Sequence, residues 1–267
     1  MTDLVTIARH GAIADVRLNR PEKYNALSPD MFKAIVAAGE QLAEAKGLRA
    51  VVLSGSGRGF CAGLDMSSFQ LMAEPGNQGS ANSLLDSHGG VANNAQRPAY
   101  VWKQLPVPVI AAIHGVAYGG GCQIALAADI RFAAPDAKMS VMEIKWGLVP
   151  DMSLSQTLRD LVPLDVAKEL TFTGRVLNGL EAKELGLVTH VTDDPLAAAL
   201  ELAEEIAGKS PSAVRAGKRL LEESWHAEPE VGLRLEASLQ KSLIGLPNQL
   251  EAVAANFANR AANFTDD

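Results

Sequence analysis

The chain has 267 residues, of which 48% are hydrophobic, and its formal net charge at pH 7 is −7. This composition predicts a globular protein with a large core and excludes global disorder. The acidic balance argues against a nucleic-acid-binding protein, because no basic stripe is available to contact phosphates. Two isolated cysteines, five scattered histidines and the lack of a signal-peptide or membrane-span pattern predict a cytoplasmic protein with no metal site and no membrane contact.

Strand and helix patterns alternate through the first part of the chain. Residues 4–9 and 12–19 have the pattern of a β-hairpin around His10 and Gly11. Residues 28–45 predict a helix that is capped by Ser28 and has Pro29 at its first position. Short apolar runs at 49–55, 107–113 and 128–134 predict buried strands with helices between them. This alternation predicts an α/β protein.

The pattern changes in two places along the chain. From residue 195 to 267 four helical stretches follow one another, each opened by or near a proline, and no strand pattern remains. We therefore expect a core over residues 1–194 that holds the site, and a helical C-terminal region over 195–267 that serves assembly and covers the site. Residues 73–99 are rich in Gly and Asn and predict a mobile loop with a helix in it, forming a lid over residues 70–100.

Two glycine-rich segments each follow a predicted strand: "SGSGRGFCAGLD" at 54–65 and "HGVAYGGGCQ" at 114–123. Neither matches a nucleotide-binding fingerprint, and each alone fits a tight turn or close helix packing. Together they place two backbone N–H groups at the ends of core strands, which is the arrangement of an oxyanion hole. Cys122 with His114 as its base is a weaker hypothesis, because no third orienting group is evident; a buried cysteine is usually a small hydrophobe.

Two acidic residues, Glu143 and Asp151, stand in an apolar stretch. Gly147 and Pro150 separate them, so they belong to different elements and can converge. Asp151 is alternatively a residue that starts the following helix, although Ser153 with Gln156 is expected to form the capping box there. Carboxylates among Met, Trp and Leu side chains have a raised pKa, as a general acid or base near neutral pH requires.

Five motifs, taken in order, carry a resemblance to a known family: "RPEKYNALS", "GRGFCAGLDM", "VPVIAAIHGVAYGGGCQIALAADIRFAA", "EIKWGLVPD" and "EAKELGLVTHV". The chain resembles the enoyl-CoA hydratase/isomerase family, the crotonase superfamily, over essentially its whole length. The resemblance implies a crotonase-type spiral of ββα units with a C-terminal helical region, assembled as a homotrimer or a dimer of trimers. It implies an acyl-CoA substrate, in which coenzyme A is part of the substrate, and no separate cofactor.

The resemblance also implies roles for particular residues. The oxyanion hole comes from the N–H groups of Leu64 and Gly120, and Glu143 and Asp151 are the catalytic acids. The glycines then let a thioester carbonyl reach a helix N-terminus, where enolate charge is stabilised. Contacts to the acyl group or to coenzyme A are expected from Lys23, Ala26, Ala62, Gly63, Asp65, Met66, Gln123 and Trp146.

Gln123 departs from the family pattern. The family's hydratases carry a glutamate at that position and a second one at the position of Glu143, and the pair holds the water that adds to the double bond. An amide cannot exchange a proton with water as a carboxyl group does. Asp151, eight residues after Glu143, matches an acid of the family's dienoyl-CoA isomerases, which carry aspartate where Gln123 stands, so the match to that branch is partial.

These observations favour an enoyl-CoA or dienoyl-CoA isomerase. In that hypothesis, Glu143 or Asp151 moves the proton and the backbone N–H groups stabilise the enolate. One alternative is an enoyl-CoA hydratase in which Glu143 and Asp151 jointly hold the water. Another, from a different class, is a catalytically weak acyl-CoA-binding protein.

Overall fold

The main sheet forms the framework of the core. In this computed structural model, which describes residues 3–72, 83–87 and 89–266, the sheet has the order β1-β2-β3-β4-β6-β8. Its strands are β1 (Val5–His10), β2 (Ile13–Leu18), β3 (Ala50–Gly55), β4 (Val109–Ile113), β6 (Ile130–Ala133) and β8 (His190–Val191). The hairpin β1–β2 is antiparallel and the other neighbouring pairs are parallel. The predicted α/β class and the predicted hairpin are confirmed, and the carboxyl ends of the parallel strands meet at one edge.

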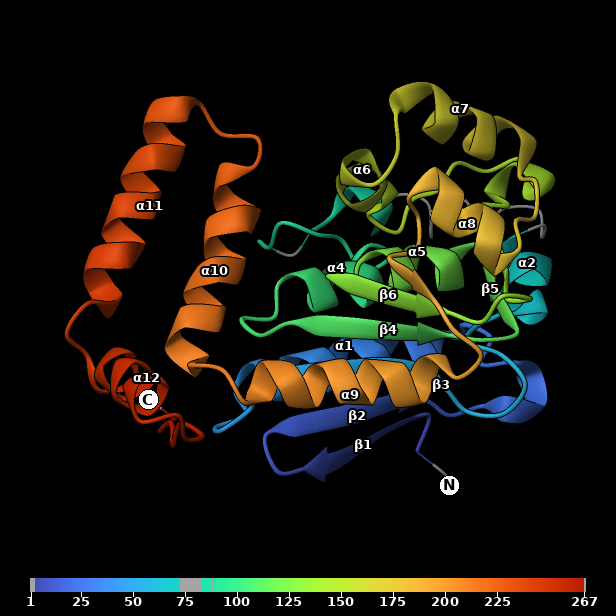
Figure 1. Cartoon of the computed structure of the whole chain (residues 1–267). Helices are drawn as coiled ribbons and strands as arrows, with labels where there is room; N and C mark the ends of the chain where they lie inside the picture. The colour runs from blue at the N-terminus through green and yellow to red at the C-terminus, as the bar shows by residue number, and fades with distance from the viewer. Residues whose placement is uncertain (1–2, 73–82, 88, 267) are drawn as a thin grey trace.

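The two faces of the sheet are covered by different helices (Figure 1). Along β3, Ala50 and Val52 belong to the apolar cluster that includes Ala199 and Ala203 of α9 (Pro195–Ala207). The alternate residues of β3 face the larger cluster instead, because successive side chains of a strand point to opposite faces. That larger cluster includes side chains of α1 (Pro29–Ala43), α4 (Arg97–Lys103) and α5 (Gly120–Leu126).

A second, two-stranded sheet was not predicted from the sequence. It consists of β5 (Val116–Tyr118) and β7 (Lys138–Ser140), which are parallel. β5 follows β4 after a turn at Gly115, whose φ of +58° lies in the left-handed region. Three-residue strands are too short to show a period of two in the sequence, and only the tertiary pairing defines them.

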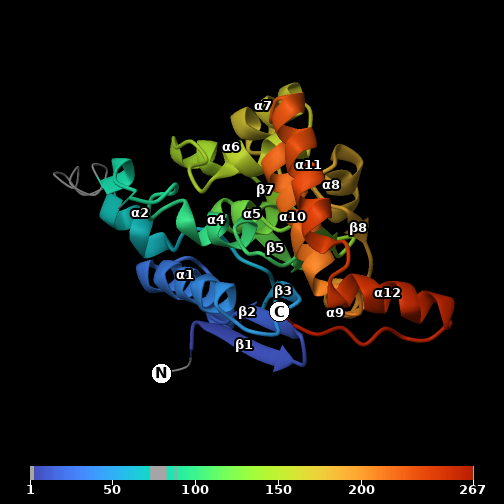
Figure 2. The same cartoon turned by 90° about the vertical axis from the view of Figure 1, so that its left-hand side faces the viewer.

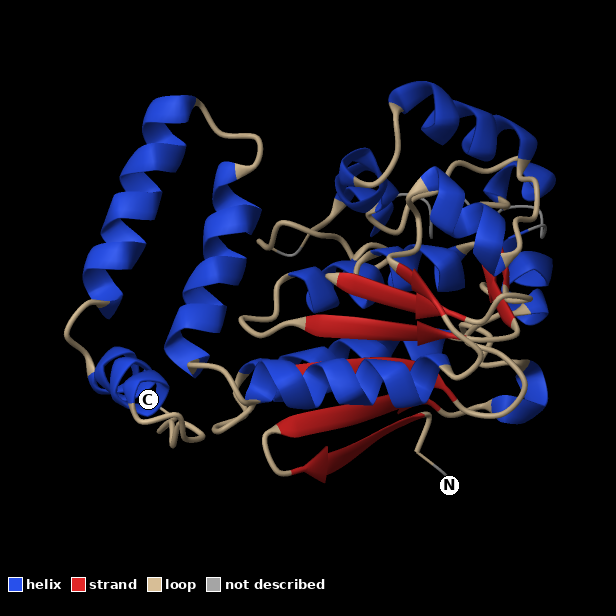
Figure 3. Cartoon of the chain, in the orientation of Figure 1, coloured by secondary structure: helices blue, strands red, loops and turns tan. Residues whose placement is uncertain are grey.

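Shorter helices connect the strands or lie beside the main sheet (Figure 3). They are η1 (Pro21–Lys23), α2 (Met66–Met72), η2 (Ser83–Leu85), η3 (Glu143–Trp146), α6 (Leu154–Thr157), η4 (Leu158–Asp160), α7 (Leu164–Thr173) and α8 (Gly179–Leu185). The predicted lid over residues 70–100 falls in part on 73–82 and 88, which lie outside the described residues.

The C-terminal helices all begin where the sequence places them. α9, α10 (Pro211–Ser224), α11 (Pro229–Leu243) and α12 (Pro247–Phe257) each have proline at the first helical position. The predicted boundary at residue 194 falls before α9, yet α9 packs on the main sheet and is part of the core. α10, α11 and α12 lie to one side of the sheet in Figure 1, and Figure 2, viewed from that side, shows α10 and α11 in front of the core.

Apolar side chains remain exposed on these outer helices. Leu233 on α11 is 64% exposed, and Phe257 at the end of α12 is 87% exposed. Side chains of this kind are the ones that an assembly interface covers. Within the described residues, none of the helices has the length and apolar character needed to cross a membrane.

Candidate active site

The two glycine-rich segments lie side by side at the carboxyl ends of β3 and β4. The Cys61 N–H donates to the Val116 carbonyl and the Tyr118 N–H donates to the Cys61 carbonyl, both at 2.9 Å. A Cβ added to Gly63 would lie 2.5 Å from the carbonyl oxygen of Tyr118, so only glycine permits this approach. The predicted convergence of the two segments is thus present in the fold.

Two backbone N–H groups remain available at this junction. Gly63 has φ of +84°, and its carbonyl accepts from the Leu27 N–H at 2.8 Å. Gly119, with φ of +51°, precedes the first residue of α5, Gly120. None of the hydrogen bonds among the described residues uses the N–H of Leu64 or of Gly120. Both groups can therefore donate to a substrate oxygen, as an oxyanion hole requires.

Glu143 lies against this junction. A Cβ built on Gly119 would be 3.3 Å from Glu143 Oε1. That oxygen accepts a hydrogen bond of 2.6 Å from Gln123 Nε2, whereas Oε2 is buried and has no partner among the described residues. Desolvation raises the pKa of Glu143 and the charge of Asp151 adds to the rise, while the Glu143 backbone N–H and the Gln123 amide oppose it.

Asp151 is the second acid, in the turn that precedes α6. It is exposed in the single chain, yet the protein around its carboxyl raises its pKa by desolvation. Because Asp151 also raises the pKa of Glu143, the two carboxyls act on one another electrostatically. The structure therefore brings together both predicted acids and both predicted N–H donors.

The expected capping box at Ser153 and Gln156 is wrong. Ser153 has φ of +65° in the left-handed region, and its hydroxyl is buried without a partner in the described part of the chain. Gln156 Nε2 instead donates to Ser155 Oγ at 3.3 Å. The positive φ removes the extended backbone that an N-cap side chain needs to reach back to the first turn. Asp151 makes no described hydrogen bond to this helix either, so its interpretation as a capping residue has no support.

The residues predicted to contact coenzyme A lie on two paired loops. The Ala62 N–H donates to the Tyr24 carbonyl at 2.9 Å, next to Lys23. Ala26 and Gly63 are buried in this pairing, whereas Lys23 is exposed and Met66 is 58% exposed. An exposed ammonium beside backbone is suited to a phosphate.

Asp65 was expected to contact the substrate, but its carboxylate is hydrogen-bonded to groups of the protein. Its carboxylate accepts from the Ser67 N–H at 3.0 Å and from Arg20 Nη1 at 2.5 Å. The hydrogen bonds of the Ser67 backbone and hydroxyl, and then that of Arg20, lower the pKa of Asp65 to about 2. These bonds hold Asp65 at the start of α2, so it fixes the loop that carries Leu64.

Asn25 was not singled out from the sequence, although it holds the two loops together. It is fully buried, with φ of +56°. Its Nδ2 donates to the carbonyls of Gly59 at 2.9 Å and Phe60 at 3.1 Å, and its Oδ1 accepts from the Arg20 N–H at 2.8 Å. Asparagine tolerates the left-handed region better than most residues. An asparagine within this loop is therefore the sequence feature that could have indicated its role.

Trp146, another predicted contact, lies three residues after Glu143. It ends the short helix that Glu143 begins and stacks on Phe69 of α2, with ring centroids 4.1 Å apart. Phe69 was not predicted as part of the site. The stacking joins the element of the first acid to the helix that follows Leu64 and Asp65.

The two cysteines have no nucleophilic character. Cys61 and Cys122 are buried, and desolvation raises the pKa of each thiol to about 12. Since the thiolate is the nucleophile, neither reacts readily at neutral pH. The interpretation of Cys122 as a small hydrophobe agrees with this burial.

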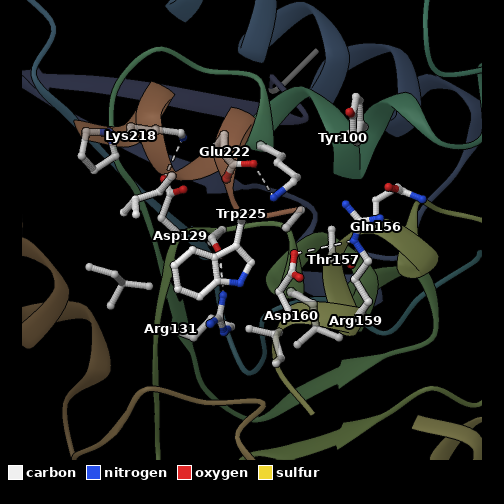
Figure 4. Close-up of a pocket in the computed structure, with 18 of the residues that line it drawn as sticks. Tyr100, Asp129, Arg131, Gln156, Thr157, Arg159, Asp160, Lys218, Glu222 and Trp225 are labelled. Carbon is white, nitrogen blue, oxygen red and sulfur yellow. Dashed lines mark hydrogen bonds and ion pairs between the residues drawn. The ribbon is translucent and has the colours of Figure 1, made fainter. Parts of the chain in front are cut away.

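A separate cavity of about 560 Å³ lies between α10 and the main sheet (Figure 4). Lys218 and Trp225 line it from the α10 side, and Lys218 Nζ pairs with Asp129 Oδ2 at 2.8 Å. It reaches Leu126 at the far end of α5, and none of the predicted site residues lines it. The cavity is therefore distinct from the junction that holds the acids.

Known proteins resemble this chain along its whole length. The family model described as enoyl-CoA hydratase/isomerase matches residues 8–267. The mitochondrial enoyl-CoA hydratase domain-containing protein 2 of Mus musculus is 34% identical over 259 residues, which cover 94% of this chain and 84% of that protein. The peroxisomal Delta(3,5)-Delta(2,4)-dienoyl-CoA isomerase of Arabidopsis thaliana is 33% identical over 251 residues, which cover 92% and 90%.

A solved structure gives the same result for the fold. The enoyl-CoA hydratase from Bacillus anthracis superimposes with a TM-score of 0.89 at 29% identity, covering 99% of this chain and 100% of that one. The expected crotonase-type fold is confirmed.

Proposed function

The chain belongs to the enoyl-CoA hydratase/isomerase family, and on that premise we propose that it isomerises an enoyl-CoA or dienoyl-CoA thioester. The observation that carries this proposal is the direct hydrogen bond of 2.6 Å between Gln123 Nε2 and Glu143 Oε1. Where a hydratase places a second carboxylate to hold water, this site has an amide in contact with the acid. Proton transfer between two carbons needs only a carboxyl group that can give the proton back.

The proposed mechanism uses the junction of the two glycine-rich segments. The thioester carbonyl accepts from the N–H groups of Leu64 and Gly120, which stabilise the enolate as it forms. Glu143 or Asp151 removes a proton from carbon, and one of the two returns a proton to another carbon of the conjugated system. The raised pKa of both acids brings them nearer to neutrality, where a proton is taken and returned with similar ease.

The remaining parts of the proposal concern binding and assembly. Lys23 supplies positive charge for the phosphates of coenzyme A, and Trp146 with Phe69 forms an apolar wall for the acyl group. The exposed apolar side chains of α10 to α12 are assigned to an assembly interface, and the assembly as a homotrimer or a dimer of trimers rests on the resemblance to the family.

Hydration is the second candidate reaction. Glu143 Oε2 is buried without a described partner, and Asp151 is close enough to shift the pKa of Glu143. A water held between these two groups would add to a 2-enoyl thioester. The hydratases among the relatives keep this alternative open.

One experiment separates the candidates. Saturated, 2-enoyl, 3-enoyl and 3,5-dienoyl thioesters are incubated in deuterated water and followed by ultraviolet absorbance and mass. An isomerase shifts the double bond and incorporates deuterium without gaining the mass of water. A hydratase adds water, and a binding protein changes none of the thioesters. In the isomerase case, Gln123→Glu raises hydration of 2-enoyl thioesters above its starting level; brisk wild-type hydration that Gln123→Glu leaves unchanged contradicts the proposal.

A further inference from the structure

Gln123 connects the two elements that carry the acids. It lies on α5 and is completely buried, with 0% of its surface exposed. Its Nε2 donates to Glu143 Oε1 at 2.6 Å, and its Oε1 accepts from the Met152 N–H at 2.8 Å. One amide thus holds Glu143 and the residue that directly follows Asp151.

We propose that Gln123 is a positioning and specificity-determining residue, which fixes Glu143 in one orientation and leaves Glu143 Oε2 as the oxygen that exchanges protons. This inference rests on the proposed function, because it assumes that Glu143 transfers the proton. It adds a residue that acts through Glu143 and needs no contact with the substrate.

The need for both a donor and an acceptor explains an amide at this position. The carboxylate of Glu143 requires a donor on one side, and the Met152 N–H requires an acceptor on the other. An ionised glutamate at position 123 satisfies only the Met152 N–H and places a second negative charge beside Glu143. A methionine of similar length satisfies neither group, and a buried polar group left without a partner destabilises the native state.

The contact also bears on the type of reaction. Two side chains whose polar atoms are 2.6 Å apart leave no room for a water molecule between them. A water placed between positions 123 and 143 is therefore excluded while the amide is in place. Gln123 commits Glu143 to proton transfer and disfavours hydration through that pair.

The electrostatic effect of Gln123 is separable from that of its neighbours. The titratable groups that interact with Glu143 are the carboxyl of Asp151, which raises its pKa, and the thiol of Cys122, whose own pKa Glu143 raises. The Gln123 amide acts in the opposite direction, since it favours the ionised carboxylate. Removing the amide should therefore raise the pKa of Glu143 further.

The test compares the wild type with Gln123→Met and with the matched control Gln41→Met, on the exposed side of α1. Glutamate labelled with ¹³C at the side-chain carboxyl is incorporated, and the Glu143 signal is identified by its loss in Glu143→Gln. We expect the pKa of Glu143 to rise by about one unit in Gln123→Met, a tenfold change in its protonation equilibrium. The acidic limb of the isomerase pH profile should move by the same amount, and neither should move in Gln41→Met.

The outcomes distinguish this inference from the proposed function. An unchanged Glu143 pKa in a folded Gln123→Met variant overturns the inference. This holds even if the variant is less stable, because a glutamine that only supports the fold would lower stability and leave the Glu143 pKa unchanged. If the Glu143 pKa rises in Gln123→Met but the wild type has no isomerase activity, the positioning role of Gln123 is supported and the proposed isomerase function is refuted. If Gln123→Met does not fold, Gln123→Glu is titrated instead: a raised Glu143 pKa with coupled titration of the two carboxyls is expected, and independent titration at the wild-type value overturns the inference.

Discussion

Replacing Gly120 by alanine tests the oxyanion hole with one added methyl group. The new Cβ would lie 2.5 Å from Met152 Sδ and 2.8 Å from Leu27 Cδ1. Both distances are shorter than carbon and sulfur atoms tolerate, so the ends of the Met152 and Leu27 side chains or α5 itself must shift. Overpacking of this kind costs about 1–3 kcal/mol of stability, which a domain of this size survives.

The effect on turnover should exceed the effect on folding. A shift at Gly120 moves the N–H that we assign to the oxyanion hole, and loss of one such donor costs about 2.7–4 kcal/mol of transition-state stabilisation. We therefore expect kcat to fall by about 10²–10³ in Gly120→Ala, and further in Gly120→Val, whose branched side chain adds two more carbons to the same space.

The assay measures kcat on the best thioester together with thermal unfolding. Gly217→Ala is the matched control, because Gly217 lies on α10 and a Cβ there meets no atom within 4 Å. It should keep full activity and gain up to about 1 kcal/mol of stability from helix propensity. Near-normal turnover in a folded Gly120→Val variant would refute the assignment of this N–H to the oxyanion hole.

Four further predictions concern the acids and the outer helices. Glu143→Gln should lower kcat by about 10²–10⁴ and Asp151→Asn by less. A Glu143→Gln variant that keeps the wild-type kcat excludes Glu143 as the proton carrier. Because burial raises the pKa of Glu143 above its unfolded value, ionisation destabilises the native state as pH rises past about 4.5. Glu143→Gln should therefore have a higher Tm than the wild type at pH 7, and an unchanged Tm contradicts the raised pKa. Lys218→Met removes the ammonium from Asp129, whose Oδ2 keeps the hydrogen bond from the Val109 N–H, and should cost about 1.5–3 kcal/mol in urea unfolding, whereas an unchanged midpoint shows that α10 is held by other contacts. Light scattering should find a trimer or larger assembly, and a stable monomer at micromolar concentration excludes an assembly role for residues 195–267.

Much of the fold could be predicted because local chemistry fixes it. The helices of the C-terminal region begin at prolines, since a proline at the first position lacks only an N–H that has no helical partner. Ser28 caps α1 through a hydrogen bond from the Met31 N–H, as the sequence predicts. Where the sequence failed, at Ser153, the backbone lies in a left-handed conformation that tertiary packing imposes.

The sequence indicated the parts of the candidate site but not the contacts that connect them. Glycines at strand ends and acids in apolar stretches marked the two segments and the acids Glu143 and Asp151, and the resemblance to the family named Leu64 and Gly120 as the N–H donors. The stack of Trp146 on Phe69 joins segments more than seventy residues apart, and no periodicity records such a contact.

Gln123 shows what the sequence does not give about the chemistry. From the sequence, it counts as a missing acid, a departure that removes the partner with which a hydratase holds water. In the fold it is a buried amide whose two ends are both hydrogen-bonded, one to the acid and one to the backbone beside Asp151. Glutamine and glutamate have nearly the same size, so packing alone does not choose between them. The choice depends on whether Glu143 needs a hydrogen-bond donor or a second carboxylate beside it, and that need differs between moving a proton and adding water.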